Sequence, residues 1–273
     1  MRVRSLHIYP VKSTAGLSLD EAAVEPWGLA DDRRWSVIDD GGERLVAWDV
    51  PLLLRVLAVP TPQGIRLTAP GRADLEVCYP DPEVRIASPY SRLATAVPAG
   101  AEAACWLSEL LGQKVQLLWL DDPRLRPVSP DRGGRPGEYL SLADAGPVLL
   151  TSLASLAQLD QWSAERAAAD GQPPVGPLAM GRFRPNLVID GELPFAEDGW
   201  DEVQVGEVSF RRAMLCDRCV ITTIDPVDLS RGREPMRTLA RHRRWDGHTW
   251  FGIRLVPRST GVIRVGDPVT VAS

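Results

Sequence analysis

The run Met214-Leu-Cys-Asp-Arg-Cys-Val-Ile-Thr-Thr-Ile-Asp-Pro226 joins a Cys-x-x-Cys pair to a β-branched segment. The β-branched residues 220–224 favour a strand directly after the second cysteine. Similar short runs lie on both sides of it, and they predict strands over residues 187–190, 202–205, 208–212, 250–256 and 262–265. The second half of the chain is therefore expected to be a closed β-barrel with attached helices.

Two amphipathic segments interrupt these strands. Leucines and a tryptophan recur at helical spacing within residues 152–169, and Gly171 follows as a stop signal. A second helix is expected over residues 235–244.

The first half reads as short strands separated by Gly, Pro and Asp turns, which is typical of a small barrel or sandwich. A helix is predicted over residues 101–111, where Gly112 ends it, and a strand over 115–119. The other predicted strands are residues 3–8, 22–24, 35–38, 53–59, 65–67 and 75–77. Residues 121–137 are rich in Pro, Gly and Arg, so we place the domain boundary there, giving domains 1–120 and 121–273. The same segment could equally be a basic loop over a site.

Composition limits the possible ligands. The chain has 273 residues and a net charge of −5, so no general attraction to nucleic acid or to an anionic membrane is expected. An anionic ligand would have to be held by a local cluster of arginines and lysines. The sequence has no signal-peptide pattern and no stretch of 18 apolar residues, and it has four cysteines, so a cytoplasmic protein with reduced thiols is expected.

The Cys216/Cys219 pair has two possible interpretations. Zinc or iron–sulfur sites need about four soft ligands, and Cys78 and Cys105 are far away in the sequence. A thioredoxin-like site would place the pair at a helix N-terminus, whereas a strand is predicted here. Either both thiols are small buried hydrophobic groups, or one thiolate beside Arg218 binds a single metal. Cys219 is then the better ligand candidate, and Cys216 supports it.

Other motifs suggest anion contacts. In Tyr9-Pro-Val-Lys-Ser13, the proline ends a strand and leaves an ammonium, a hydroxyl and backbone N–H groups that suit a phosphate, although an ordinary surface turn would look the same. Asp31-Asp-Arg-Arg-Trp35 and Arg182-Phe-Arg-Pro-Asn186 add arginines suited to bidentate phosphate contacts. The three histidines do not indicate a Ser–His–Asp enzyme, and no P-loop or Rossmann loop is present.

Taken together, these motifs resemble the MOSC family, the family of the molybdenum cofactor sulfurase C-terminal domain, and within it the amidoxime-reducing members. The resemblance covers nearly the whole chain and includes the family's N-terminal β-barrel domain. It implies a mainly β fold with attached helices (α+β), in which a small N-terminal β-barrel domain precedes a MOSC-type β-barrel domain. The motifs that carry it are Tyr9-Pro-Val-Lys-Ser13, Asp32-Arg-Arg-Trp35, Phe183-Arg-Pro-Asn186, Phe195-Ala-Glu-Asp-Gly-Trp200, Cys216-Asp-Arg-Cys219, Thr222-Thr-Ile-Asp-Pro226 and Val265-Gly-Asp-Pro-Val269.

The resemblance also implies a cofactor and the residues that hold it. Cys219 would be the thiolate ligand of the metal in a molybdenum cofactor (Mo-molybdopterin), and soft sulfur suits that metal. Gly146 stands where the family usually has a hydroxyl residue, which leaves backbone N–H groups as donors there. The other positions implied to bind the cofactor are Lys12, Ser13, Arg33, Ala145, Gly146, Arg184, Asn186, Asp217 and Arg218.

The activity implied is that of an oxidoreductase that reduces N-hydroxylated compounds such as hydroxylamines, amidoximes and N-hydroxylated base analogues. Electrons would come from a separate flavin or iron–sulfur protein, and Asp225, Arg132 and Arg135 could shape the substrate pocket. One alternative is a molybdenum cofactor binding or sulfur-carrier protein in which Cys219 bears a persulfide. Another is a β-barrel interaction domain without cofactor. No nucleic acid or membrane partner is expected.

Overall fold

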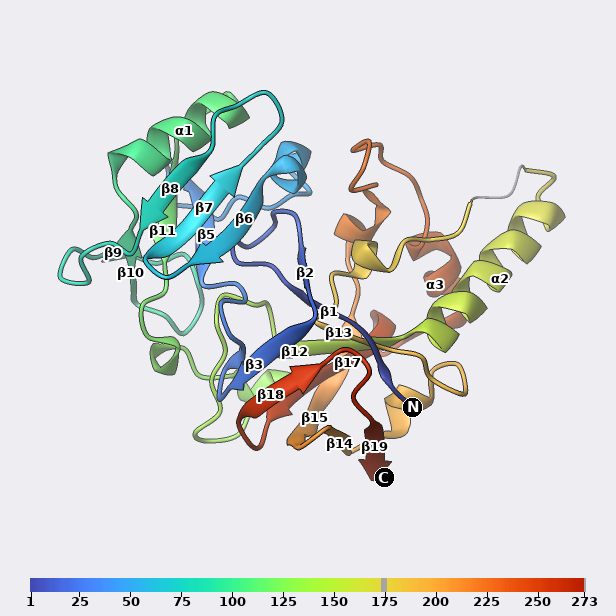
Figure 1. The fold of residues 1–273 in the computed structure, drawn as a ribbon. Helices are drawn as coiled ribbons and strands as arrows, with labels where there is room; N and C mark the ends of the chain where they lie inside the picture. Colours follow the sequence, from blue (N-terminus) through green and yellow to red (C-terminus); the bar gives the residue numbers. More distant parts are fainter. Residues whose placement is uncertain (173–175, 273) are drawn as a thin grey trace. The chain divides into compact units, whose positions relative to one another are not determined.

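The computed structural model describes residues 1–172 and 176–272, which form two compact units. Unit 1 contains residues 1–7, 18–26 and 146–273, and unit 2 contains residues 8–17 and 27–145. The mainly β fold with attached helices is confirmed (Figure 1). Unit 2 ends at residue 145, and unit 1 continues from residue 146. The predicted domain boundary at residue 121 stays a prediction.

The main sheet of unit 1 has the strand order β19-β14-β15-β17-β12-β13-β1-β2. Its pairs are antiparallel at β14–β15, β15–β17, β12–β17 and β1–β13, and parallel at β12–β13. Within the described residues no pairing closes this order into a ring, so the expected closed barrel is an open sheet. The strands are β1 (Val3–Ile8), β2 (Leu17–Leu19), β12 (Val148–Ser152), β13 (Leu187–Ile189), β14 (Glu202–Val205), β15 (Val208–Asp217), β17 (His248–Pro257) and β19 (Val269–Ala272).

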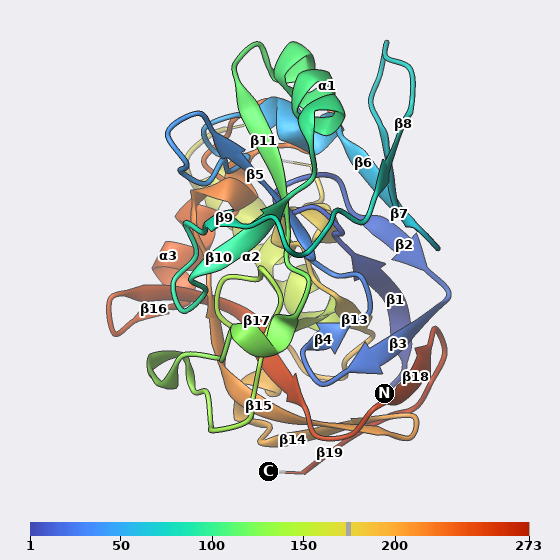
Figure 2. The same ribbon diagram turned by 90° about the vertical axis from the view of Figure 1, so that its left-hand side faces the viewer.

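Three further short strands lie in unit 1. The strand β18 (Gly261–Arg264) pairs antiparallel with β3 (Glu21–Glu25), and the two lie together in Figure 2. The strand β16 (Arg244–Trp245) pairs with the start of β17.

The helix α2 (Leu153–Ala169) connects β12 to the parallel strand β13, as a crossover between parallel strands requires. Its N-cap is Ser152, whose hydroxyl accepts a hydrogen bond from the Ser155 N–H at 3.0 Å. The buried face of α2 packs with β12 and with the short helix α3 (Met236–His242), which in turn contacts β17. The core between them consists of Leu156, Leu159, Leu178, Phe183, Leu239 and Phe251. This core fixes η4 (Met180–Phe183), the 3-10 turn that precedes Arg184.

The segment after the cysteine pair differs from its prediction. Residues 220–224 were expected to form a strand, but Val220–Thr223 form the 3-10 turn η6. The hydroxyls of Thr222 and Thr223 donate back to the carbonyls of Cys219 and Val220 at 3.0 and 2.7 Å. Such local bonds compete with strand pairing, which explains the failure of the β-propensity argument.

Unit 2 contains two separate sheets and the helix α1 (Ala101–Leu111). One sheet has the order β5-β11-β10-β9, and the other has the order β6-β7-β8. Helix α1 contacts β11 and β8, and it ends at Gly112, which adopts φ +70° as the predicted stop. The strands of unit 2 are β4 (Gly28–Leu29), β5 (Trp35–Asp39), β6 (Leu57–Thr61), β7 (Gly64–Thr68), β8 (Leu75–Cys78), β9 (Ile86–Ala87), β10 (Thr95–Pro98) and β11 (Val115–Trp119).

One predicted strand of unit 2 is partly wrong. Residues 53–59 were expected to be a single strand, but Pro51–Arg55 form the 3-10 helix η1 before β6 begins. Pro51 presets the first helical φ, and the adjacent Leu53 and Leu54 are both buried. Two adjacent inward-facing residues fit a helical turn and conflict with the alternation of a strand.

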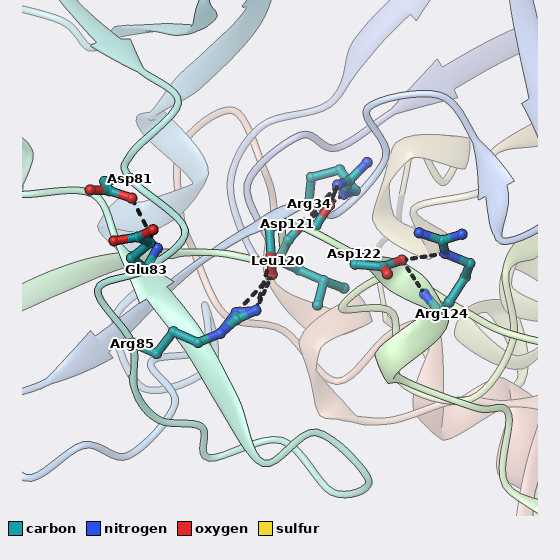
Figure 3. A network of polar contacts seen from close by, with 8 residues as sticks. All are labelled: Arg34, Asp81, Glu83, Arg85, Leu120, Asp121, Asp122 and Arg124. Carbon is teal, nitrogen blue, oxygen red and sulfur yellow. Dashed lines mark hydrogen bonds and ion pairs between the residues drawn. The ribbon is translucent and has the colours of Figure 1, made fainter.

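The Pro-, Gly- and Arg-rich segment begins with a network of arginine contacts (Figure 3). The Arg34 guanidinium donates to the carbonyls of Leu120 and Asp121, and Arg85 donates to both carboxylate oxygens of Asp121. Asp122 then caps the 3-10 turn η2 (Pro123–Leu125) by accepting from the Arg124 N–H at 3.0 Å. The start of this segment is thereby fixed within unit 2.

Candidate functional site

The two cysteines of the Cys-x-x-Cys pair lie in different environments. Two register shifts interrupt the pairing of β15 with β17, and Cys216 lies at the second of them, buried. Cys219 is exposed and occupies the N-cap position of η6. Bulges of this kind re-aim side chains at the end of a strand. The pair therefore presents one thiol to solvent and keeps the other inside.

The Arg218 side chain is anchored between these cysteines. Its Nη1 donates to Cys216 Sγ at 2.9 Å, and its Nη2 donates to the Phe183 carbonyl at 2.6 Å. The guanidinium was expected to act on Cys219, its neighbour in sequence, but these bonds direct it to Cys216. Cys216 is thus a support for Arg218. The Arg218 Nε is buried and has no hydrogen-bond partner within residues 1–172 and 176–272.

Arg184 and Asn186 follow η4 in unit 1. Arg184 adopts the left-handed conformation, with φ +54°, and caps η4. Asn186 is buried; its side-chain oxygen accepts from the Leu149 N–H and its amide nitrogen donates to the His7 carbonyl, both at 3.1 Å. Asn186 therefore ties β12 to β1, and its predicted contact with a cofactor stays a prediction.

Asp217 and Gly146 both lie next to Arg254, a residue that the sequence analysis did not single out. Arg254, on β17, lies 3.6 Å from Asp217 through Nη2 and Oδ1, and His248 Nδ1 lies 3.9 Å from the other carboxylate oxygen. A Cβ at Gly146 would stand 2.8 Å from Arg254 Cβ. The absence of a side chain at position 146 makes room for the Arg254 stem.

Asp225 pairs with a cation of the same unit. Its Oδ2 accepts from Arg182 Nη2 at 2.5 Å, and its Oδ1 accepts from the Val227 N–H. Arg132 was predicted, like Asp225, to shape the substrate pocket. It ends the 3-10 turn η3 (Pro130–Arg132) of unit 2. The Arg135 N–H, also in unit 2, donates to Glu138 Oε2 at 2.8 Å.

In unit 2, Lys12 is a buried cation. Its Nζ donates to the Leu142 carbonyl at 2.9 Å and to Asp144 Oδ1 at 2.5 Å. Burial lowers the pKa of Lys12 to about 8, against the opposing attraction of Asp144. This ammonium lies 5.5 Å from the centre of the Tyr90 ring, and Arg126 lies 5.2 Å from the same ring. Burial also raises the pKa of Tyr90 to about 12, so the ring stays neutral.

Ser13 and Arg33 have the same strained backbone conformation. Their φ angles are +68° and +51°, a region that L-residues seldom adopt and that is enriched at functional sites. Asp32, which is buried, accepts from the Tyr9 N–H at 2.9 Å and from Arg33 Nη1 at 2.6 Å. The Arg33 guanidinium lies over the Tyr9 ring at 4.6 Å. Two neighbours therefore hold Arg33 in place.

The predicted cofactor residues divide between the units. Unit 2 holds Lys12, Ser13, Arg33 and the buried Ala145, and unit 1 holds Gly146, Arg184, Asn186, Asp217, Arg218 and Cys219. Sequence reasoning missed Asp32, Tyr90, Arg126 and Arg254 as supporting residues. Asp32 stood inside a quoted motif, and a carboxylate next to an arginine was an available signal. The sequence around Tyr90 and Arg254 gave no such signal.

No group of three or more His, Cys, Asp or Glu side chains in the described part of the chain could hold a metal ion. No described helix is long and apolar enough to span a membrane.

Comparisons with known proteins agree with the motifs. The family "MOSC N-terminal beta barrel domain" matches residues 1–114, and the family "MOSC domain" matches residues 138–270. The human mitochondrial amidoxime-reducing component 1 is 31% identical over 98% of this chain and 82% of its own length, and the mouse protein is 32% identical over 98% and 81%. The molybdenum cofactor sulfurase of Danio rerio is 30% identical over 93% of this chain and 32% of its own length.

Proposed function

Because the chain belongs to the family that joins a MOSC N-terminal beta barrel domain to a MOSC domain, we propose that it is a molybdenum-cofactor-dependent reductase of N-hydroxylated compounds. Its curated relatives associate the family with amidoxime reduction and with the molybdenum cofactor. One local observation carries the proposal: an exposed thiol, Cys219, directly follows an arginine that is anchored on two sides.

The residues of unit 1 fit such a group. A buried guanidinium nitrogen without a partner costs free energy unless a ligand satisfies it, and Arg218 Nε is in that position within the described part of the chain. Cys219 would ligate the metal, since thiolate is a soft donor. The other ligands would come from the cofactor, because the described residues provide no cluster of metal-binding side chains beside it. Arg184, Asn186, Asp217 and the Gly146 backbone would contact the pterin.

The residues of unit 2 suit the anionic part of a cofactor. Lys12 supplies a buried ammonium, and Arg33 supplies a guanidinium held by Asp32. Charged donors of this kind make strong hydrogen bonds to phosphate. Ser13, and the backbone at Ala145, would add neutral donors. The strained backbone at Ser13 and Arg33 supports a binding role, because such strain persists where function requires it.

When bound, the cofactor supplies the two-electron chemistry that cleaves the N–O bond. Converting an N–OH group to N–H takes two electrons and two protons and releases water. The electrons would come from a separate flavin or iron–sulfur protein. The protein residues bind and orient: Arg218 fixes the backbone between the end of β15 and Cys219, and the Arg182–Asp225 pair holds the segment that follows η6.

The test is metal and pterin analysis of the full chain purified from a host that makes the cofactor. We expect about one molybdenum per chain in the wild type, loss of the metal in Cys219→Ala, and no loss in Cys78→Ala, which removes another exposed thiol. Reduction of an amidoxime by reduced methyl viologen should follow the same order. Equal molybdenum content and activity in wild type and Cys219→Ala would refute the ligand assignment.

A sulfur-carrier function is the second candidate, favoured by the exposure of Cys219 and by the similarity to a molybdenum cofactor sulfurase. In that case Cys219 would carry a persulfide, which mass spectrometry detects as one added sulfur atom. Persulfide on Cys219 without bound molybdenum or amidoxime reduction would favour the carrier over the reductase.

A further inference from the structure

A second candidate site lies in unit 1 and contains none of the residues predicted to bind the cofactor. It is a pocket of about 310 Å³, which is at the lower end of small-molecule sites. Five arginines line it, together with one carboxylate and a wall formed by Ala167 and Leu178. The arginines are Arg166, Arg182, Arg231, Arg233 and Arg237.

These arginines converge from separate elements. Arg166 lies on α2, Arg182 on η4 and Arg237 on α3, and the other two lie on the loop of residues 230–234. The loop is fixed by its backbone: the Gly232 N–H donates to the Thr223 carbonyl and the Asp225 N–H donates to the Ser230 carbonyl, both at 2.9 Å. The cations are thus brought together by the fold in a chain whose net charge is −5.

Carboxylates pair with Arg166, Arg182 and Arg237 of this pocket. Glu234 is buried and pairs with Arg166, Asp170 pairs with Arg166 and Arg237, and Asp225 pairs with Arg182. The Asp228 carboxylate also interacts electrostatically with Arg182. The Arg233 side chain makes no hydrogen bond or ion pair with the described residues.

We propose that this pocket binds a small organic phosphate. Guanidinium groups match the geometry of a phosphate in bidentate contacts, and several of them around one pocket favour a dianion over a monocarboxylate. The pocket is larger than inorganic phosphate alone, and its apolar wall would contact the organic part of the ligand. Thr223 lines the pocket and ends the turn that Cys219 caps, so an occupant would contact the segment after the thiol.

The experiment is calorimetric titration of the full chain with inorganic pyrophosphate, and with a mononucleotide and a sugar phosphate, at constant ionic strength. Arg233→Gln/Arg237→Gln removes two charges from the pocket. The matched control is Arg241→Gln/Arg244→Gln, which removes two exposed charges from the last turn of α3 and from β16, outside the pocket. We expect affinity to fall at least about tenfold in the pocket variant and to stay unchanged in the control, as two lost charged hydrogen bonds require.

Lys12→Met removes a proposed cofactor residue that does not line the pocket. Phosphate binding in the pocket should be unchanged in this variant, which separates the two sites. Three results would overturn the proposal: none of the phosphates binds, the two double variants lose affinity equally, or citrate binds while the phosphates do not. Molybdenum content is unaffected by any of these results, so the failure of this site and the failure of the proposed reductase are distinguishable.

Discussion

Asp32→Asn tests how Arg33 is held. Asp32 Oδ2 accepts from Arg33 Nη1 at 2.6 Å, the Asp32 side chain is 1% exposed, and the Arg33 side chain is 13% exposed. Asparagine keeps the oxygen that accepts from the Tyr9 N–H, but it can place an N–H₂ group against the guanidinium. The substitution therefore removes one buried ion pair and leaves the rest of the turn intact.

The magnitude follows from burial. Breaking a buried pair by removing one partner costs about 3–5 kcal/mol, and the remaining exposure of Arg33 together with its contact over the Tyr9 ring favours the lower end, about 3 kcal/mol. With a urea m-value of about 3 kcal/mol/M for a chain of this size, the unfolding midpoint should fall by about 1 M. Tryptophan fluorescence would follow the transition, since Trp35 and Trp119 stack within unit 2.

The neighbouring carboxyl is the control. Burial raises the pKa of Asp31, so its charge is disfavoured by the fold, and Asp31→Asn should change the free energy of unfolding by less than about 0.5 kcal/mol. If the two variants unfold at the same urea concentration, the ion pair does not hold Arg33 and the reasoning is wrong.

Three other predictions rest on titration and packing. Burial raises the pKa of Glu197, so the native chain keeps a proton that the unfolded chain releases. The wild type should therefore lose stability as the pH rises above about 4.5. Glu197→Gln, which can still accept a hydrogen bond from Ser155, should remove that loss when urea unfolding is compared at pH 4.5 and 7.5. The pKa of Lys12 is lowered to about 8, so between pH of about 8 and 10.5 the unfolded chain binds a proton that the native chain has released. The stability of the wild type relative to Lys12→Met should therefore rise over this pH range. A constant difference between the two proteins would contradict the burial of Lys12 as a cation. Gly146→Ser should cost about 1–3 kcal/mol because its Cβ would stand 2.8 Å from the Arg254 Cβ. Thermal unfolding should show that Gly146→Ser costs less in a background of Arg254→Gly, which removes that Cβ, than in the wild type; an equal cost in both backgrounds would contradict the steric argument.

Local signals predicted much of the fold. The helix over residues 101–111 and the strands over residues 3–8, 115–119 and 202–205 have the bounds expected from periodicity and turn residues. The strand β12 was missed because all five of its residues are buried, so its sequence shows no alternation of apolar and polar residues. The side-chain hydroxyls after Cys219 overrode β-propensity in η6.

The site was less predictable than the fold. Motifs identified which residues deserve attention, but the partner of Arg218 depends on a bulged strand end and on η4, which is far away in the sequence. The relation of Gly146 to Arg254 depends on tertiary packing between residues more than 100 positions apart. Contacts of this kind have no local sequence signal.

The left-handed backbone lowers stability at three residues whose side chains are proposed to bind the cofactor: Ser13, Arg33 and Arg184. Glycine would relieve the backbone strain at each position, by up to about 1 kcal/mol, and would remove the side chain that the proposed cofactor needs. A selection for thermal stability alone should therefore accumulate glycine at these three places, and a selection for activity should exclude it. Comparing the two selected populations would separate the positions that serve the ligand from those that serve the fold.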